Sequence, residues 1–281
     1  MTATASPKPK APRRSAGSTR TRVIEKRTPR VIAPPAVTNR GAAAKPQSAP
    51  VTPLAPADRV SYSFHGDSET VRLPMWVHDL ESFRRWAVSD EAPEKVPVFF
   101  LAGEVWIDMS KQQVFSHVRM KQELLRVLGN LVKATRQGDM FPDGLLLSNV
   151  DADLSGNPDG TFVSRESFRE KRVRLVEGKK SGYVELEGTP DMVLEVVSDS
   201  SVQKDTAILR DLYWKAGIPE FWIVDGRHDT VEFTILKHTA RGYSAVRNAA
   251  GWLKSSVFGK SFRLTRRLDE LGHPDFVLDV K

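Results

Sequence analysis

The sequence contains no cysteine. This absence excludes disulfide bonds, thiolate zinc sites and cysteine nucleophiles, so carboxylates, histidine and lysine must carry any chemistry. The chain also lacks an apolar run of the roughly 20 residues that a membrane-spanning helix needs, and its start lacks the apolar core of a secretory signal. We therefore expect a cytoplasmic protein with no membrane partner.

Three common catalytic signatures are also missing. The chain has no glycine-rich phosphate-binding loop, no Ser-His-Asp elbow and no His-Glu-x-x-His segment. These absences disfavour nucleotide hydrolysis by a P-loop, esterase chemistry and zinc proteolysis.

Acidic residues are scarce in the first 60 positions, which hold 12 Lys or Arg against Glu25 and Asp58. The formal net charge is +7 for the whole chain, so residues 61–281 carry −3. The first 60 positions also hold 10 of the 18 prolines, a composition that buries too little apolar surface to offset the entropy of ordering. We predict a disordered basic arm over residues 1–57 and one folded domain over 58–281. The arm could bind phosphate backbones or act only as a solubilising extension.

Strands and helices alternate through the centre of the chain. Apolar residues at three-four spacing predict a long helix over 114–134, and a second helix at about 204–216 would end at Gly217. A connection over 164–188 is expected to be functional or mobile because of its length. The alternation indicates an α/β (α+β) fold with a central mixed β-sheet flanked by helices. The predicted strands cover 96–109 as a hairpin, 144–150, 161–163, 192–197, 221–225, 230–237, 243–247 and 256–264, the last three closing the sheet edge.

Glu195 is the most informative residue, because it lies inside an apolar strand, MVLEVV, that reads as covered on both faces. A buried carboxylate must be protonated, paired with a cation or bound to a metal ion. Asp191 lies on the same strand but roughly 13 Å away at 3.3 Å per residue, too far to share one metal ion. Asp159 opens the preceding strand and is the better partner, since adjacent strands are about 4.8 Å apart.

Two carboxylates with waters suit Mg²⁺, which prefers hard oxygen ligands. Lys204, at the start of the next predicted helix, could reach the two acids and stabilise a developing negative charge. A structural ion pair for Glu195 and an ordinary solvated lysine at 204 are the alternatives.

Pro158-Asp159, followed by a strand with Glu195, resembles the PD-(D/E)xK nuclease signature. Residues 190–225 are similar to the Uma-type family of putative restriction endonucleases, which typically shows Pro-Asp, an apolar strand with Glu, a helix with Tyr, and an aromatic-Trp-Val-Asp strand. The resemblance covers about residues 75–270. It rests on Pro190-Asp191, Glu195, Ser198, Tyr213, Gly217-Ile218 and Phe221–Asp225, with Gly103-Glu104 and His117 upstream.

The resemblance implies a restriction-endonuclease-like fold and a metal-dependent endonuclease that hydrolyses phosphodiester bonds. It implies nucleic acid, with DNA expected, as the partner, Mg²⁺ or Mn²⁺ as the cofactor, and a homodimer as one option. Asp159, Asp191, Glu195 and Lys204 are the candidate catalytic residues, with Asp159 and Glu195 as metal ligands. Glu104 is either a solvated residue or a further acid near the metal.

One position departs from the superfamily pattern. The superfamily's lysine stands two residues after the acid, where this chain has Val197. Related proteins can supply the lysine from the following helix, which points to Lys204, with Arg210 as the second choice. If neither reaches the site, the alternative is a catalytically inactive nuclease-fold protein that binds nucleic acid or oligomerises.

Overall fold

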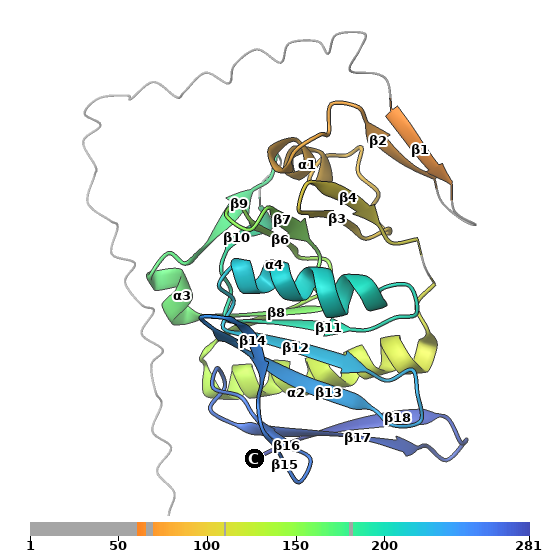
Figure 1. Ribbon diagram of the computed structural model, residues 1–281, viewed down its shortest axis with the longest axis vertical. Helices are drawn as coiled ribbons and strands as arrows, with labels where there is room; N and C mark the ends of the chain where they lie inside the picture. Colours follow the sequence, from red (N-terminus) through yellow and green to blue (C-terminus); the bar gives the residue numbers. More distant parts are fainter. Residues whose placement is uncertain (1–60, 66–69, 110, 180–181) are drawn as a thin grey trace, which may run out of the picture. The chain divides into compact units, whose positions relative to one another are not determined.

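The computed structural model describes residues 61–65, 70–109, 111–179 and 182–281 (Figure 1). The chain divides into two units, residues 1–52 and 53–281, and all described residues belong to the second unit. The basic segment 1–57, predicted from sequence to be a disordered arm, lies outside the described residues.

A mixed six-stranded sheet carries the strands that the sequence marks as most apolar, in the order β14-β13-β12-β11-β8-β5. β11 pairs in parallel with β12 and antiparallel with β8, while the remaining pairs are antiparallel. This confirms the predicted central mixed sheet. Its strands are β5 (Gly138–Pro142), β8 (Gly160–Ser164), β11 (Met192–Val196), β12 (Glu220–Asp225), β13 (Glu232–Thr239) and β14 (Gly242–Ala245).

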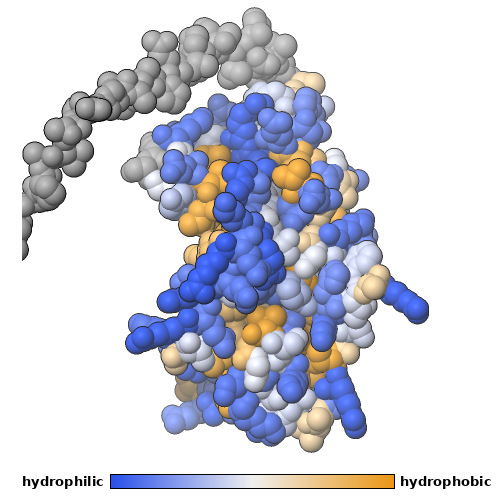
Figure 2. All heavy atoms as spheres, turned by 90° about the vertical axis from the view of Figure 1, so that its left-hand side faces the viewer, coloured by the Kyte–Doolittle hydropathy of each residue, from blue (hydrophilic) through white to orange (hydrophobic). Residues whose placement is uncertain are grey.

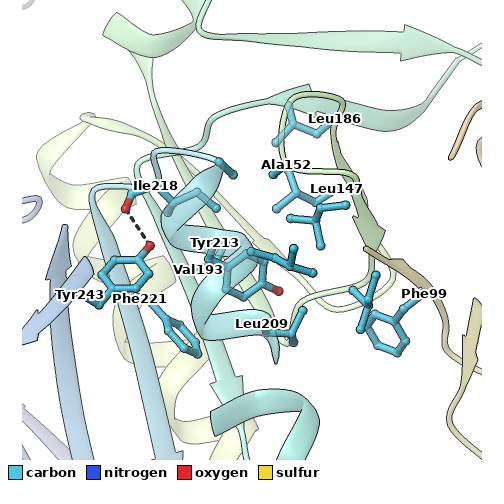
Figure 3. Close-up of a cluster of buried hydrophobic side chains, with 14 of the residues drawn as sticks. Phe99, Leu147, Ala152, Leu186, Val193, Leu209, Tyr213, Ile218, Phe221 and Tyr243 are labelled. Carbon is cyan, nitrogen blue, oxygen red and sulfur yellow. Dashed lines mark hydrogen bonds between the residues drawn. The ribbon is translucent and has the colours of Figure 1, made fainter. Parts of the chain in front are cut away.

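Helices cover both faces of this sheet. α2 (Met120–Thr135) follows a π-helical segment, Val114–Arg119, and α4 (Leu209–Lys215) follows another, Lys204–Ile208. Successive side chains of a strand point to opposite faces, so Leu194 packs in one apolar cluster with Leu124 of α2, while Val193 packs in another with Tyr213 of α4 (Figure 3). Glu195 therefore points to the α4 side.

A second six-stranded sheet has the order β4-β3-β7-β6-β10-β9. Its β3–β4 hairpin turns at Ala102 and Gly103, both with positive φ, as the sequence predicts. The strand predicted at 144–150 forms as β6 but belongs to this sheet. The strands are β3 (Val98–Leu101), β4 (Glu104–Ile107), β6 (Leu146–Asn149), β7 (Leu154–Gly156), β9 (Val173–Glu177) and β10 (Tyr183–Gly188).

Two predictions are wrong, one about a connection and one about the sheet that a strand joins. The segment 164–188 is not a plain connection, because it folds into the short helix α3 (Arg165–Arg169) and the β9–β10 hairpin. The strand expected at 256–264 does not close the central sheet, since β17 joins a separate four-stranded sheet. That sheet contains β15 (Asn248–Ala249), β16 (Trp252–Lys254), β17 (Ser261–Leu268) and β18 (Pro274–Val280).

The remaining elements lie near the start of the described residues. β1 (Ser61–His65) and β2 (Thr70–Pro74) form an antiparallel pair. α1 (Leu80–Ala87) begins at Asp79, whose carboxylate accepts a hydrogen bond from the Ser82 backbone N–H while the Ser82 hydroxyl reaches back to the Asp79 backbone. This capping box satisfies amide groups that the first turn leaves unpaired.

On the face shown in Figure 2, hydrophilic side chains predominate and hydrophobic ones lie in separate small patches. Large contiguous apolar patches are the usual mark of a docking surface. Among the described residues, none of the helices has the length and apolar content needed to cross a membrane.

Candidate active site

A cleft of about 1210 Å³ lies where the two six-stranded sheets and the start of α2 meet. It is larger than the roughly 300–1,000 Å³ of a typical small-molecule pocket. Its wall includes the end of β4, the start of β10, the turn before β6, the turn before β8, and the segment after β11. The polar residues that line it include Lys95, Asp108, Lys111, His117, Lys121, Asp143, Asn157, Asp159, Tyr183, Glu195, Ser198, Ser201, Lys204 and Asp205.

Asp159 and Glu195 occupy opposite positions at the end of the β8–β11 pairing. Leu194 pairs with Gly160 in the antiparallel β8–β11 ladder, so the next residue of β11 stands opposite the residue that precedes β8. The carboxylate of Asp159 also accepts a hydrogen bond of 2.8 Å from the backbone N–H of Val196. The structure thus brings together the two acids that the sequence analysis proposes as metal ligands.

Glu195 is almost completely buried, with 2% of its surface exposed. Burial raises the pKa of Glu195 well above its usual range, and the nearby carboxylates Asp205 and Asp159 raise it further, while Lys204 opposes the shift. The hydroxyl of Tyr213 donates a hydrogen bond of 2.6 Å to Glu195 Oε1. Burial also raises the pKa of Tyr213, so this hydroxyl stays protonated.

Lys204 lies in the same cleft, at the start of the π-helical segment that leads into α4. Its Nζ lies 2.7 Å from Asp205 Oδ1 and 4.4 Å from the centre of the Phe99 ring. Burial opposes the charge on this lysine, but the carboxylates of Glu195 and Asp205 outweigh burial and raise the pKa of Lys204. Lys204 therefore keeps its positive charge inside the cleft.

Arg210, the second choice for the displaced lysine, does not line the cleft. Its guanidinium donates a hydrogen bond of 3.2 Å to the carbonyl of Tyr243 on β14. Of the two sequence candidates, the structure places only Lys204 beside Glu195.

Asp205 is a third acid that the sequence analysis does not single out. It is buried, pairs with Lys204 and accepts a hydrogen bond from the Ser201 hydroxyl. Burial raises the pKa of Asp205 above its ordinary value. We call Asp159, Glu195 and Asp205 the acid centre.

Lys121 is the second residue that sequence reasoning missed. Its Nζ lies 2.9 Å from Asp143 Oδ2 and 3.1 Å from Asp159 Oδ1. Burial opposes its charge, but Asp159 and Asp143 outweigh burial and raise the pKa of Lys121. A signal exists, because Lys121 stands three residues before Leu124 and so extends the buried stripe of α2.

His117 occupies the same stripe one turn earlier and is also buried. Its Nε2 lies 3.7 Å from Asp159 Oδ2, while its Nδ1 has no hydrogen-bond partner among the described residues. Burial lowers the pKa of His117, so the ring is neutral near pH 7. His117 therefore adds a neutral nitrogen donor to the edge of the acid centre.

Asp191 and Glu104 lie apart from this group. Asp191 does not line the cleft, and its carboxylate accepts hydrogen bonds of 2.6 Å from the Ser164 backbone N–H, the Ser167 hydroxyl and the Arg172 guanidinium. Glu104 is exposed beside the β3–β4 turn and does not line the cleft either. Neither residue lies where it could share a ligand with Glu195.

The donor set of the acid centre can be compared with the needs of common metal ions. Among the described residues, no three His, Asp or Glu side chains are arranged to hold a metal ion by themselves. Zinc sites need three or four protein ligands, whereas Mg²⁺ is bound through one or two carboxylates and keeps several waters. Two carboxylates, from Asp159 and Glu195, are the kind of donor set that Mg²⁺ or Mn²⁺ takes.

Two comparisons with known proteins found similar ones. A family model described as "Uma2: Putative restriction endonuclease" matches residues 80–266, which include the acid centre, Lys121 and Lys204. The crystal structure of a "putative nuclease belonging to DUF820" from Anabaena variabilis ATCC 29413 is similar, with 16% sequence identity and a TM-score of 0.48 over 64% of this chain and 90% of that one. None of the curated proteins matches the chain.

Proposed function

The chain belongs to the Uma2 family of putative restriction endonucleases, and from this premise we propose that it is a Mg²⁺-dependent endonuclease hydrolysing phosphodiester bonds of nucleic acid, with DNA as the expected substrate. The observation that carries the proposal is the meeting of Asp159 and Glu195 from adjacent strands, beside the charged Lys204, in one large cleft.

Asp159 and Glu195 have the role of metal ligands in this proposal. Mg²⁺ or Mn²⁺, when bound, would supply Lewis-acid stabilisation of the scissile phosphate and lower the pKa of the attacking water. The backbone N–H of Val196 and the hydroxyl of Tyr213 orient the two carboxylates, each through one hydrogen bond. Such outer hydrogen bonds fix ligand geometry before substrate arrives.

Lys204 has the role of the catalytic cation. A fixed positive charge in a site of low dielectric stabilises the negative charge that builds up on a phosphate in the transition state. Lys204 meets the requirement, because its neighbours keep it protonated and its position beside Phe99 removes it from bulk water. Lys121, which holds Asp159 and Asp143 together, orients Asp159 and adds a second positive charge to the cleft.

A metal titration of the full-length protein tests the proposal. Wild type should bind Mn²⁺ in isothermal titration calorimetry, while Asp159→Ala and Glu195→Ala should each abolish binding and leave the circular dichroism spectrum unchanged. Asp211→Ala is the matched control, because Asp211 is an exposed acid outside the cleft that pairs with Lys215. Wild-type affinity in the Asp159→Ala, Glu195→Ala double variant would contradict the proposal.

The alternative is an inactive nuclease-fold protein that binds nucleic acid or oligomerises. It is favoured by the position two residues after Glu195, where Val197 replaces lysine, and by the hydrogen bonds that both acids already make within the protein. This alternative predicts no heat of Mn²⁺ binding and no cleavage of single- or double-stranded DNA or RNA by the purified wild type.

A further inference from the structure

Tyr183 is an exposed aromatic residue in the wall of the cleft, with 61% of its surface accessible. Its neighbour Val184 also lines the cleft and is 41% exposed. Successive residues of a regular strand point to opposite faces, whereas Tyr183 and Val184 are both exposed at the start of β10. The pairing of β10 with β9 shifts between Tyr183 and Glu185. Such bulges commonly redirect a side chain beside a functional site.

The strand pairing places Tyr183 at the same end of the second six-stranded sheet as Asp143. β10 runs parallel to β6, with Glu185 opposite Leu146. Tyr183 precedes Glu185 by two residues and Asp143 precedes Leu146 by three, so both stand just before the paired region of adjacent strands. Tyr183 and Asp143 therefore enter the cleft from neighbouring positions.

Asp143 in turn is joined to the acid centre. The ammonium group of Lys121 donates hydrogen bonds to Asp143 and to Asp159. One side of the cleft thus presents an exposed aromatic ring, and the adjoining side presents a lysine and a metal-binding carboxylate. The base of a nucleotide could stack on the aromatic ring, while its phosphate lies beside the lysine and the carboxylate on the adjoining side.

The burial of the acid centre bears on whether the nucleic acid is single-stranded or a duplex. The side chains of Asp159 and Lys204 are 14% and 9% exposed, and Glu195 is less accessible still. A duplex keeps its bases paired and stacked inside a rod, with a major groove about 12 Å wide. Its bases cannot reach an aromatic ring on a cleft wall, whereas an unpaired strand can place a base on the ring and its phosphate deeper in the cleft.

We propose that Tyr183 stacks on a base of an unpaired nucleotide, so that the substrate class of this cleft is single-stranded nucleic acid or an unpaired segment. The inference rests on the nuclease function proposed above and adds a specificity-determining residue to it. Exposed aromatic rings that accept bases without sequence preference are a common means of binding single strands.

Binding of fluorescein-labelled oligonucleotides by full-length protein, followed by fluorescence anisotropy with EDTA present, tests the inference. Three probes share one length: a single-stranded DNA, the same strand with abasic sites, and the corresponding duplex. Tyr183→Ala should weaken binding of the single strand by about fivefold or more, the scale of one lost base stack, and leave the abasic strand unaffected. Tyr183→Phe should bind like wild type, because the ring is kept. Tyr62→Ala is the matched control, since Tyr62 is 59% exposed and lies outside the cleft.

Several results would overturn the inference: unchanged binding by Tyr183→Ala, an equal loss with the abasic strand, tighter binding of the duplex than of the single strand, or no binding by wild type. A cleavage assay with Mg²⁺ separates this inference from the proposed function. If wild type cleaves and Tyr183→Ala binds normally, the nuclease function stands and the stacking role fails. If the Tyr183 effect is seen but no cleavage occurs, the stacking role stands and the nuclease function fails.

Discussion

Glu220 and Glu195 lie on the adjacent parallel strands β12 and β11, and both are almost inaccessible to solvent. Their surroundings differ. Glu220 is surrounded by neutral donors from the C-terminal part of the chain, which satisfy both of its oxygens. The donors are the Trp222 indole N–H, the Ser255 and Ser256 hydroxyls, and the backbone N–H groups of Ser256 and Val257.

Glu195 has the opposite environment. One hydroxyl, from Tyr213, donates to it, and the other charged groups around it include two acids and one lysine. Glu220 is thus a structural carboxylate that fixes a loop, and its burial is compensated by hydrogen bonds. Glu195 is held beside two further acids with a single hydroxyl donor, an environment that raises its pKa and is typical of residues that serve a function. Burial alone does not separate the two acids, whereas their hydrogen-bond partners do.

The largest effect on this comparison is expected from Glu220→Ala. The change leaves several buried donors without an acceptor, and each such donor costs roughly 1–3 kcal/mol, so we expect the free energy of unfolding to fall by about 4 kcal/mol. Urea denaturation measures the loss. The exposed Asp211→Ala variant should change the same quantity by less than about 0.5 kcal/mol. A loss below about 1 kcal/mol for Glu220→Ala would show that the closed network is not structural.

The second largest effect is expected from removing the charge of Lys204, the lysine beside Glu195. Lys204→Met keeps most of the side-chain length and removes the charge, so it should cut cleavage of a DNA substrate by at least about a hundredfold. Mn²⁺ binding at pH 8 should persist, because Asp159 and Glu195 remain. The measurement is the rate of single-turnover cleavage at saturating metal.

Arg210→Met is the discriminating variant for this prediction. Arg210 has a similar charge but contacts Tyr243 outside the cleft, so its loss should leave the cleavage rate near that of wild type. Normal cleavage by Lys204→Met together with a large loss in Arg210→Met would keep the nuclease function and reverse the assignment.

The local part of this site could be predicted from sequence. An acid in an apolar β-branched run marks Glu195, and the Asn-Pro-Asp-Gly turn places Asp159 at the start of a strand, because both signals depend on neighbours in the chain. The pairing of β8 with β11 then brings these acids together as expected. The placement of Lys204 beside Glu195 follows from the short connection between β11 and α4.

The parts that could not be predicted depend on long-range pairing. Apolar runs show that a strand is buried but not which sheet it joins, so β17 was expected at the edge of the central sheet and belongs to another sheet. Lys121 and Asp205 were missed for a related reason. Both are charged residues on buried helical faces. The partners of Lys121, Asp143 and Asp159, are distant in sequence. The partner of Asp205 is its neighbour Lys204, which the sequence alone also allows to be an ordinary solvated lysine.

The smallest effect, and the sharpest test of the comparison, is expected from Glu195→Gln. The pKa of Glu195 is raised in the folded protein above the value near 4.5 that applies to the unfolded chain. The folded state therefore holds more protons than the unfolded state between pH 4.5 and the raised pKa, and its stability falls as the pH rises through that window. Glutamine keeps an acceptor for Tyr213 and carries no charge. Glu195→Gln should thus stabilise the fold at pH 8, because it removes the cost of charging a buried carboxyl group.

The gain should shrink towards zero near pH 4, where Glu195 is protonated in both states of the wild type. Urea denaturation at the two pH values, with EDTA present to exclude metal binding, gives the difference directly. Glu220→Gln is the matched control, because it leaves donors of a closed network unsatisfied and should destabilise the fold at both pH values. A loss of stability in Glu195→Gln at pH 8 would mean that Glu195, like Glu220, contributes its charge to the structure. The distinction between Glu220 as a structural acid and Glu195 as a functional acid would then fail.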